Sequence, residues 1–393
     1  MFILRNISSL KHLQLLKLPL LIPVFIIGLV PVSAQLTKQP EKLTTWNEKY
    51  QAGMPRVSIA AMPAYTPEHQ FSAATALLIS FKTKRNNNYL NHSSLPLEYV
   101  TNFNQNHSFW GQLNSFWYDN LIKFEVEANL QNRQDHYWGV GMTDAMNEAK
   151  NESTTQYYKN YGQICPAIGV RLIENLYAGI GYNFNQTKAT NLSPALSEDT
   201  YIISQGSQIL NTGIGFLLDY KIEDIGNKPN HNLQFKSTFN LYSDSKQGDF
   251  TYQKLIISYL HSIPLEILSS RLNWNLNVEN NFGDVPWTDM AMLGGARQMM
   301  GLAEGKYREK NLVQAWLQYN YVFNSQINQT VHRHEAIVRF GGGTVYSDAS
   351  VSYTIFNFVV GYRFRYQPDY NLKLDFAFAD GSFGSYVGFE QRF

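Results

Sequence analysis

The chain has 393 residues, of which only 16% are charged while 14% are aromatic. Soluble domains carry about 25% charged residues on average, so this composition is more typical of a sheet with an apolar exterior, aromatic girdles and a polar interior. The formal net charge of +1 gives no reason to expect a nucleic-acid partner, and the single Cys165 excludes a disulfide framework or a thiolate metal cluster.

Residues 1–34 have the pattern of a secretory signal peptide. Basic residues precede an apolar run at 18–32, and Val32, Ser33 and Ala34 supply the small residues that a signal peptidase cuts. The alternative is a membrane anchor, but the run is shorter than a spanning helix of about 20 residues, and prolines interrupt it. We predict export with cleavage after Ala34, followed by a polar periplasmic lead-in over residues 35–55.

From residue 56 to residue 393, segments of alternating polar and apolar residues recur. In 231–242, for example, Leu233 and Phe235 point to one side of the chain and Asn232 and Gln234 to the other. We predict strands at 56–64, 71–81, 95–104, 108–117, 121–130, 162–172, 176–186, 208–219, 231–242, 251–261, 271–282, 313–323, 335–342, 355–365, 371–379 and 384–393. About 16 strands, an even number, predict an all-β transmembrane antiparallel barrel.

The connections between these strands differ in length from one end of the predicted barrel to the other. If Arg56 starts in the periplasm, the long connections 131–161, 187–207 and 283–311 lie outside, and the tight turns at 118–119 and 173–174 lie in the periplasm. The connection 82–94 is too long for the periplasmic side, so this pattern leaves the strand register of the N-terminal third open. A soluble exported β-sandwich is the alternative fold, but it predicts more charge on the outer face.

The most informative segment is the glycine-bearing connection at 293–311. It lies between two strands that each have one apolar and one polar face, which suggests a barrel with a long outer loop folded into its lumen. This loop contains a Leu-Gly-Gly sequence, then the dipeptide Met-Gly, and then the run Lys-Tyr-Arg-Glu-Lys-Asn.

That segment resembles the signature loop of the BamA and TamA superfamily, the bacterial surface-antigen barrels. The residues that match are Leu293, Gly294, Gly295, Gly301, Tyr307 and Arg308. Five predicted strands follow the loop, as in those barrels. The C-terminal strand, with Gly388 and the final Phe393, resembles the signal by which such barrels are recognised for insertion.

The chain also departs from the family pattern. Met300 stands where the family has an arginine that reaches into the lumen, and Leu302 replaces an aromatic residue. A thioether cannot donate the forked hydrogen bonds of a guanidinium. We therefore expect Arg297 or Arg308 to make an inward contact with Glu279 or Asp375. Residues 35–55 are too short for POTRA modules, so the resemblance implies a barrel without them.

The resemblance implies a barrel of the bacterial outer membrane that assists the assembly or export of outer-membrane proteins. Its first and last strands would part so that a client strand adds to the exposed edge. Outer-membrane lipids, the barrel-assembly machinery and client proteins are the expected partners. A passive pore or transporter and a structural, surface-exposed barrel remain the alternatives. No G-x-S-x-G elbow or metal-ligand cluster is present, so we expect neither an enzyme nor a cofactor.

Overall fold

The computed structural model describes residues 53–67, 70–102, 106–147, 151–228, 230–243, 248–265, 270–323, 334–347, 353–367 and 370–391. All of them belong to the compact unit Glu48–Phe393. The predicted signal peptide with its cleavage after Ala34, most of the lead-in, and Phe393 lie outside the described residues.

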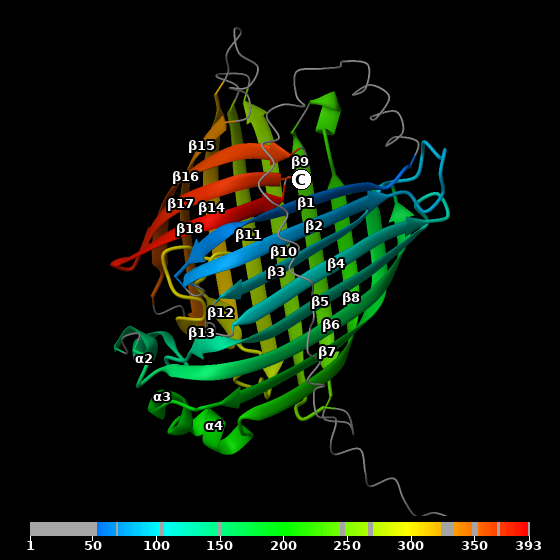
Figure 1. Cartoon of the computed structure of the whole chain (residues 1–393). Coiled ribbons are helices and arrows are strands. Elements are labelled where there is room, and N and C mark those ends of the chain that lie inside the picture. Colours follow the sequence, from blue (N-terminus) through cyan, green and yellow to red (C-terminus); the bar gives the residue numbers. More distant parts are fainter. Residues whose placement is uncertain are drawn as a thin grey trace, which may run out of the picture. The chain divides into compact units, whose positions relative to one another are not determined.

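Sixteen antiparallel strands form one closed barrel (Figure 1). They are β1 (Arg56–Thr66), β2 (Gln70–Phe81), β3 (Ser93–Asn102), β4 (His107–Trp117), β5 (Ile122–His136), β6 (Gln156–Ile173), β7 (Leu176–Thr190), β8 (Gln208–Ile222), β9 (Asn232–Tyr242), β10 (Tyr252–Leu265), β11 (Ser270–Gly283), β14 (Asn311–Val322), β15 (His334–Tyr346), β16 (Ile355–Gln367), β17 (Tyr370–Ala379) and β18 (Ser382–Gln391). Each pairs with the next, β11 pairs with β14, and β1 pairs with β18. The predicted all-β barrel is confirmed.

The alternation in the sequence becomes an apolar outside and a polar inside. In β16, Phe356, Phe358 and Val360 are exposed, whereas Asn357 and, further along, Arg363 on the other face are buried. Successive side chains of a strand point to opposite faces, so the exposed apolar set forms the outer surface of the barrel wall. The buried polar set faces the interior, where polar groups can bond to one another.

Several strands extend beyond their predicted ends. The connection predicted at 131–161 is only 137–155, because β5 runs to His136 and β6 begins at Gln156. The added residues are polar, and they pair across the strands: Asp135 lies opposite Tyr157, and its carboxylate is 3.3 Å from the ammonium of Lys159. Polarity alone had suggested a loop, but cross-strand pairing keeps these residues in the sheet.

Three long connections, 137–155, 191–207 and 284–310, lie at one end of the barrel, which we call the long-loop end (Figure 1). They carry α2 (Met142–Asn147), α3 (Pro194–Ser197), α4 (Thr200–Gln205), and the two-stranded sheet of β12 (Ala291–Leu293) and β13 (Tyr307–Glu309). The sequence alternation had not indicated these short helices. Of the helices among the described residues, none is both long and apolar enough to cross a membrane.

The connection 82–92 lies at the opposite end, with the tight turn after β4 and the short helix η2 (Ile225–Asn227). It is long for that end, but it is bonded to the neighbouring turn. The backbone N–H of Asn91 donates to Asn120 Oδ1 at 2.8 Å, and Asn120 Nδ2 donates to the carbonyl oxygen of Tyr89 at 2.6 Å. These two hydrogen bonds hold the connection 82–92 against the turn after β4.

Candidate functional site

The loop 284–310 has a backbone that only glycine can form at its sharpest bends. Gly294, Gly295 and Gly301 have φ of 120°, 93° and 98°, in the region that L side chains rarely adopt. A Cβ on Gly301 would lie 2.9 Å from the backbone nitrogen of Ala379 in β17. The matching glycines thus let the loop approach the barrel wall closely.

The tip of the loop is held by backbone hydrogen bonds. The N–H of Gly301 donates to the hydroxyl of Tyr386 on β18 at 2.9 Å, and Asn357 Nδ2 on β16 donates to the carbonyl oxygen of Met300 at 3.0 Å. Gln314 Nε2 on β14 donates to the carbonyl oxygen of Gln298 at 2.8 Å. All three strand residues are buried members of the alternating pattern. How far the loop fills the lumen stays a prediction.

Met300 contributes packing where the family has a charge. Its side chain is buried in a cluster with Val359, Ala377 and Tyr386. Such a cluster excludes water and offers no carboxylate to a charged group, so the thioether suits this place. In this chain, hydrogen bonds to the backbone of the loop tip and apolar packing hold the loop at this position.

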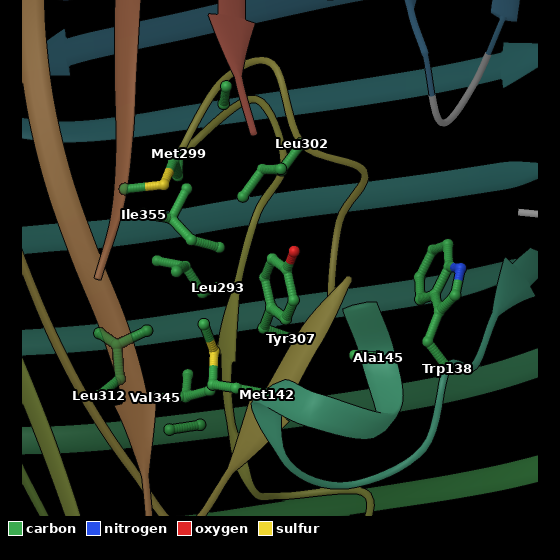
Figure 2. Packing of buried hydrophobic residues seen from close by; sticks show 12 residues of the cluster. Trp138, Met142, Ala145, Leu293, Met299, Leu302, Tyr307, Leu312, Val345 and Ile355 are labelled. Atoms are coloured by element: carbon green, nitrogen blue, oxygen red, sulfur yellow. The ribbon is translucent and has the colours of Figure 1, made fainter. Parts of the chain in front are cut away.

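A second apolar cluster fixes the loop along its length, from residues next to the tip down to Leu293 and Tyr307 (Figure 2). Leu293, Met299, Leu302 and Tyr307 of the loop pack there with Trp138 and Met142 of the first long connection and with Leu312, Val345 and Ile355 at the strand ends. Gly343 of β15 leaves room for this packing, since its Cβ would lie 3.0 Å from Leu293 Cδ1. Each buried leucine contributes roughly 1.5–3 kcal/mol. Leu302, which replaces the family's aromatic residue, belongs to this cluster.

Arg308 and Trp287 together join the three long connections. Its Nη1 donates to the carbonyl oxygen of Trp287 at 2.9 Å, and its guanidinium lies 5.1 Å from the ring of Tyr137 and 5.4 Å from the ring of Trp287. The indole Nε1 of Trp287 donates to the carbonyl oxygen of Gly206, beside α4, at 3.1 Å. The backbone N–H of Gly141 donates to the carbonyl oxygen of Arg308 at 2.8 Å. Arg308 is a structural tie between loops.

The predicted contacts of Arg297 or Arg308 with Glu279 or Asp375 were wrong. Arg297 Nη2 donates to Glu98 on β3 at 3.0 Å, and Arg308 bonds within the loops. Glu279 bonds to Lys254 of β10 at 2.9 Å, and Asp375 bonds to Arg363 of β16 at 2.6 Å. Cations on the neighbouring strands reach these carboxylates directly, so no loop residue is needed there.

Arg363 is the charged residue that the sequence interpretation missed. Its guanidinium makes two hydrogen bonds to Asp375, of 2.6 and 3.1 Å, and its Nε donates to Glu390 on β18 at 2.7 Å. It therefore joins β16, β17 and β18 from the inside. The alternation of β16 could have revealed it, since it places Arg363 on the same face as Asn357.

One more ion pair holds the loop to the opposite wall. Arg133 Nη2 of β5 lies 2.6 Å from Glu304 Oε1 of the loop. Burial alone would raise the pKa of Glu304, but the positive charges of Arg133 and Lys159 outweigh it and hold that pKa below its usual value. The carboxylate therefore stays charged and bonded to Arg133 at neutral pH.

The seam between β1 and β18 is paired much less than the other junctions. Tyr65 opposite Val387 is the single ladder pair across it in the described part of the chain. On their other sides, β1 pairs with β2 from Arg56 to Thr66, and β18 pairs with β17 from Ser382 to Gln391. Gly388, one of the predicted signal residues, lies beside this seam, opposite Lys373 of β17. Within the described residues, the seam therefore has fewer ladder pairs than any other junction of the barrel.

A cavity of about 400 Å³ lies inside the wall formed by β4 to β10. Its lining is mixed, and the polar residues in it include Glu125, Glu127, Asn183, Lys236 and Asp289. Many of these groups already bond to one another; Lys236, for instance, lies 3.2 Å from Glu125. In the described ranges, no group of three or more His, Cys, Asp or Glu side chains is placed to hold a metal ion.

No protein-family model matches the sequence, and no curated protein sequence matches it. Its structure is similar to BamA from Haemophilus ducreyi lacking POTRA domains 1-3, with a TM-score of 0.58 at 13% identity over 86% of this chain and 70% of that one. The chain has the fold of the BamA-like barrels. CdiB from Acinetobacter baumannii (TM-score 0.53, 10% identity) and CdiB from Escherichia coli (0.58, 9%) share it. This BamA-like barrel covers 66% and 63% of those two chains, and they cover 88% and 85% of it.

Proposed function

We propose that this BamA-like barrel resides in the bacterial outer membrane and assists the insertion or export of other outer-membrane proteins through the β1–β18 seam. The observation that carries the proposal is the single ladder pair across this seam, beside fully paired junctions on both flanks. Each backbone hydrogen bond contributes only about 0.5–1.5 kcal/mol, so a seam with one pair separates far more easily than its neighbours.

A parted seam would expose two strand edges, and exposed edges pair with added strands. Client strands would thus bind by main-chain hydrogen bonds, with lipids around the apolar outer surface as the other partner. In this arrangement the long-loop end faces outward and the tight turns face the periplasm, as in outer-membrane barrels. The interlocked long loops favour opening at the side of the barrel over passage through its end.

The proposal can be tested by locking the seam with a disulfide. Tyr65→Cys and Val387→Cys, in a Cys165→Ser background, place two thiols at the one ladder pair. Directly opposed strand residues have Cα atoms about 4.5–5.5 Å apart, within the range that a disulfide spans. The full chain, reconstituted in vesicles, is assayed for insertion or export of a reporter outer-membrane protein before and after oxidation.

We expect oxidation to reduce the reporter's insertion or export at least tenfold and a reductant to restore it. The matched control is Val338→Cys with Val360→Cys, an opposed outward-facing pair on the fully paired strands β15 and β16. Its disulfide should leave the activity unchanged. Equal activity of the locked and reduced seam would contradict the proposal.

A further inference from the structure

The inner wall beside the seam carries more positive than negative charge. Arg339, Arg363 and Lys373 face inward there with Asp375 and Glu390, while a further inward carboxylate, Glu335 of β15, bonds to Arg271 of β11 at 2.9 Å. Arg363 bonds both Asp375 and Glu390, at 2.6 and 2.7 Å. One cation therefore bonds two anions, and two cations remain to be accounted for.

Neither of the two other cations forms an ion pair among the described residues, although the charges of Asp375 and Glu390 act on both from a greater distance. Arg339 is bonded to neutral groups, since its Nε donates to Gln318 Oε1 at 2.8 Å and its guanidinium lies 4.4 Å from the centre of the Trp316 ring. Lys373 forms no hydrogen bond or ion pair within the part of the chain that the structure describes. An ammonium whose nearest carboxylates are already bonded to an arginine can take a further anion as its own partner.

The position of Lys373 points to the seam. It lies opposite Gly388 of β18, and a Cβ on Gly388 would lie 3.7 Å from Lys373 Cε. The pair of Tyr65 with Val387 places Ala64 of β1 next to Gly388 on the other side. At this level the inward-facing residues of β17, β18 and β1 are thus Lys373, Gly388 and Ala64, in that order. Because Gly388 has no side chain, Lys373 can extend past it toward the strand at the position of β1. The residue of β1 at this level, Ala64, carries no charge.

We propose that Lys373 recognises an acidic side chain on a polypeptide strand that enters the seam, at the inward-facing position that Ala64 holds now. This inference rests on the proposed function. The last strand already shows the same pattern, because Glu390 on the inner face of β18 bonds to Arg363 two strands away. A client strand with an acidic residue in this place would gain an ion pair that β1 cannot make.

The anion is a protein carboxylate rather than a lipid headgroup because of the face on which the charge lies. Lys373 alternates with Leu372 and Leu374 and shares the inner face with Asp375, which is fully buried. The lipid-facing side of the same strand carries exposed Phe376 and Phe378. Side chains of an added strand alternate between the two faces, so every second one enters the lumen beside Lys373.

The test uses the sequence of β1 as a probe. Synthetic peptides of Arg56–Thr66 carry Cys in place of Tyr65 and Asp, Asn or Lys in place of Ala64. The full chain carries Val387→Cys and Cys165→Ser in vesicles of phosphatidylethanolamine with phosphatidylglycerol, and disulfide cross-linking of each peptide is quantified. We expect the Asp peptide to cross-link about tenfold more than the Lys peptide and about threefold more than the Asn peptide.

Lys373→Glu should reverse the preference so that the Lys peptide is favoured, a result that a purely structural role of Lys373 would not give. Lys373→Arg should keep the preference for Asp. The matched control is Lys188→Gln, an exposed lysine on β7, which should change nothing. Heat-modifiable migration on a gel shows that each variant is folded before its cross-linking is compared.

Equal cross-linking of the three peptides would overturn the inference and leave the proposed function standing. Absence of cross-linking with every peptide would overturn the proposed function, and the inference with it. The peptide preference could also stay the same in Lys373→Glu but change with the fraction of phosphatidylglycerol in the vesicles. This result would show that the charge of the lipids sets the preference, and it too would overturn the inference.

Discussion

Two junctions join distant parts of this barrel, and they differ in strength. The loop 284–310 is held to the wall by glycine bends, backbone hydrogen bonds, an ion pair and a continuous apolar cluster. The β1–β18 seam is held, in the residues described, by one ladder pair. This difference is the basis of the proposed opening at the side of the barrel, and β18 takes part in both junctions.

The largest expected effect comes from Trp287→Ala, which removes the centre of the loop junction. Trp287 is almost fully buried, and its ring lies 5.8 Å from that of Tyr137. Truncation of a buried tryptophan costs about 3–5 kcal/mol. We expect a lower unfolding temperature, measured by heat-modifiable migration, and new single-channel conductance in planar bilayers as the long loops separate.

Trp117→Ala is the control for that experiment, because Trp117 is half exposed at the other end of the barrel. It should leave the conductance at the wild-type level. If the unmodified chain already conducts steadily at all voltages, the passive pore is the better description of this protein. If Trp287→Ala stays as stable as the wild type, the loop junction is not what closes the barrel.

Gly301→Ala is the next largest change, because it forces the loop tip away from β17. The new Cβ would meet the backbone nitrogen of Ala379 at 2.9 Å in addition to the strain of a φ of 98°. We expect a loss of about 2–3 kcal/mol in unfolding free energy. Gly381→Ala isolates the strain, since its φ is 71° with nothing within 4 Å. It should cost about 1 kcal/mol, and equal losses for the two variants would contradict the close approach.

Most of the fold could be predicted from the sequence because alternation is a local property. Strand number and the position of the glycine-bearing loop before the last five strands follow from polar and apolar residues two apart, as in β16. Strand ends could not be found in this way. The residues 131–136 look like a loop until their partners on β6 are known, and those partners lie 20 to 30 residues further on.

The contacts of the site were harder to predict because they depend on which strands are neighbours. Arg297 and Arg308 were chosen for their place in the loop, but Lys254 and Arg363 reach Glu279 and Asp375 from adjacent strands. No spacing along the chain reveals such a pairing before the register is known. The glycines of the signature loop were easier, because a required positive φ restricts the residue type itself.

Met300→Arg restores the family's arginine and tests whether the loop junction can still use it. Met300 is buried among Val359, Ala377 and Tyr386, and Arg363 already bonds Asp375. An arginine there would be overpacked and without a free carboxylate, so we expect a loss of about 1–3 kcal/mol, measured as a lower unfolding temperature. Met300→Leu, which keeps the apolar volume, should lose less than about 1.5 kcal/mol. A higher unfolding temperature for Met300→Arg would show that the loop junction can still bond an arginine at this position.

The smallest effect is expected from Tyr386→Phe, and it reports on the strand that both junctions share. The hydroxyl of Tyr386 accepts the hydrogen bond from the Gly301 N–H, which is buried, so its removal should cost about 1 kcal/mol. Tyr118→Phe, at an exposed turn, should cost nothing measurable. The rate of disulfide formation between Tyr65→Cys and Val387→Cys then gives the second measurement. If the loop steadies β18, loss of this bond should change that rate about twofold or more, since about 1 kcal/mol is a factor of five in population. An unchanged rate with a lower unfolding temperature would mean that the loop and the seam act independently.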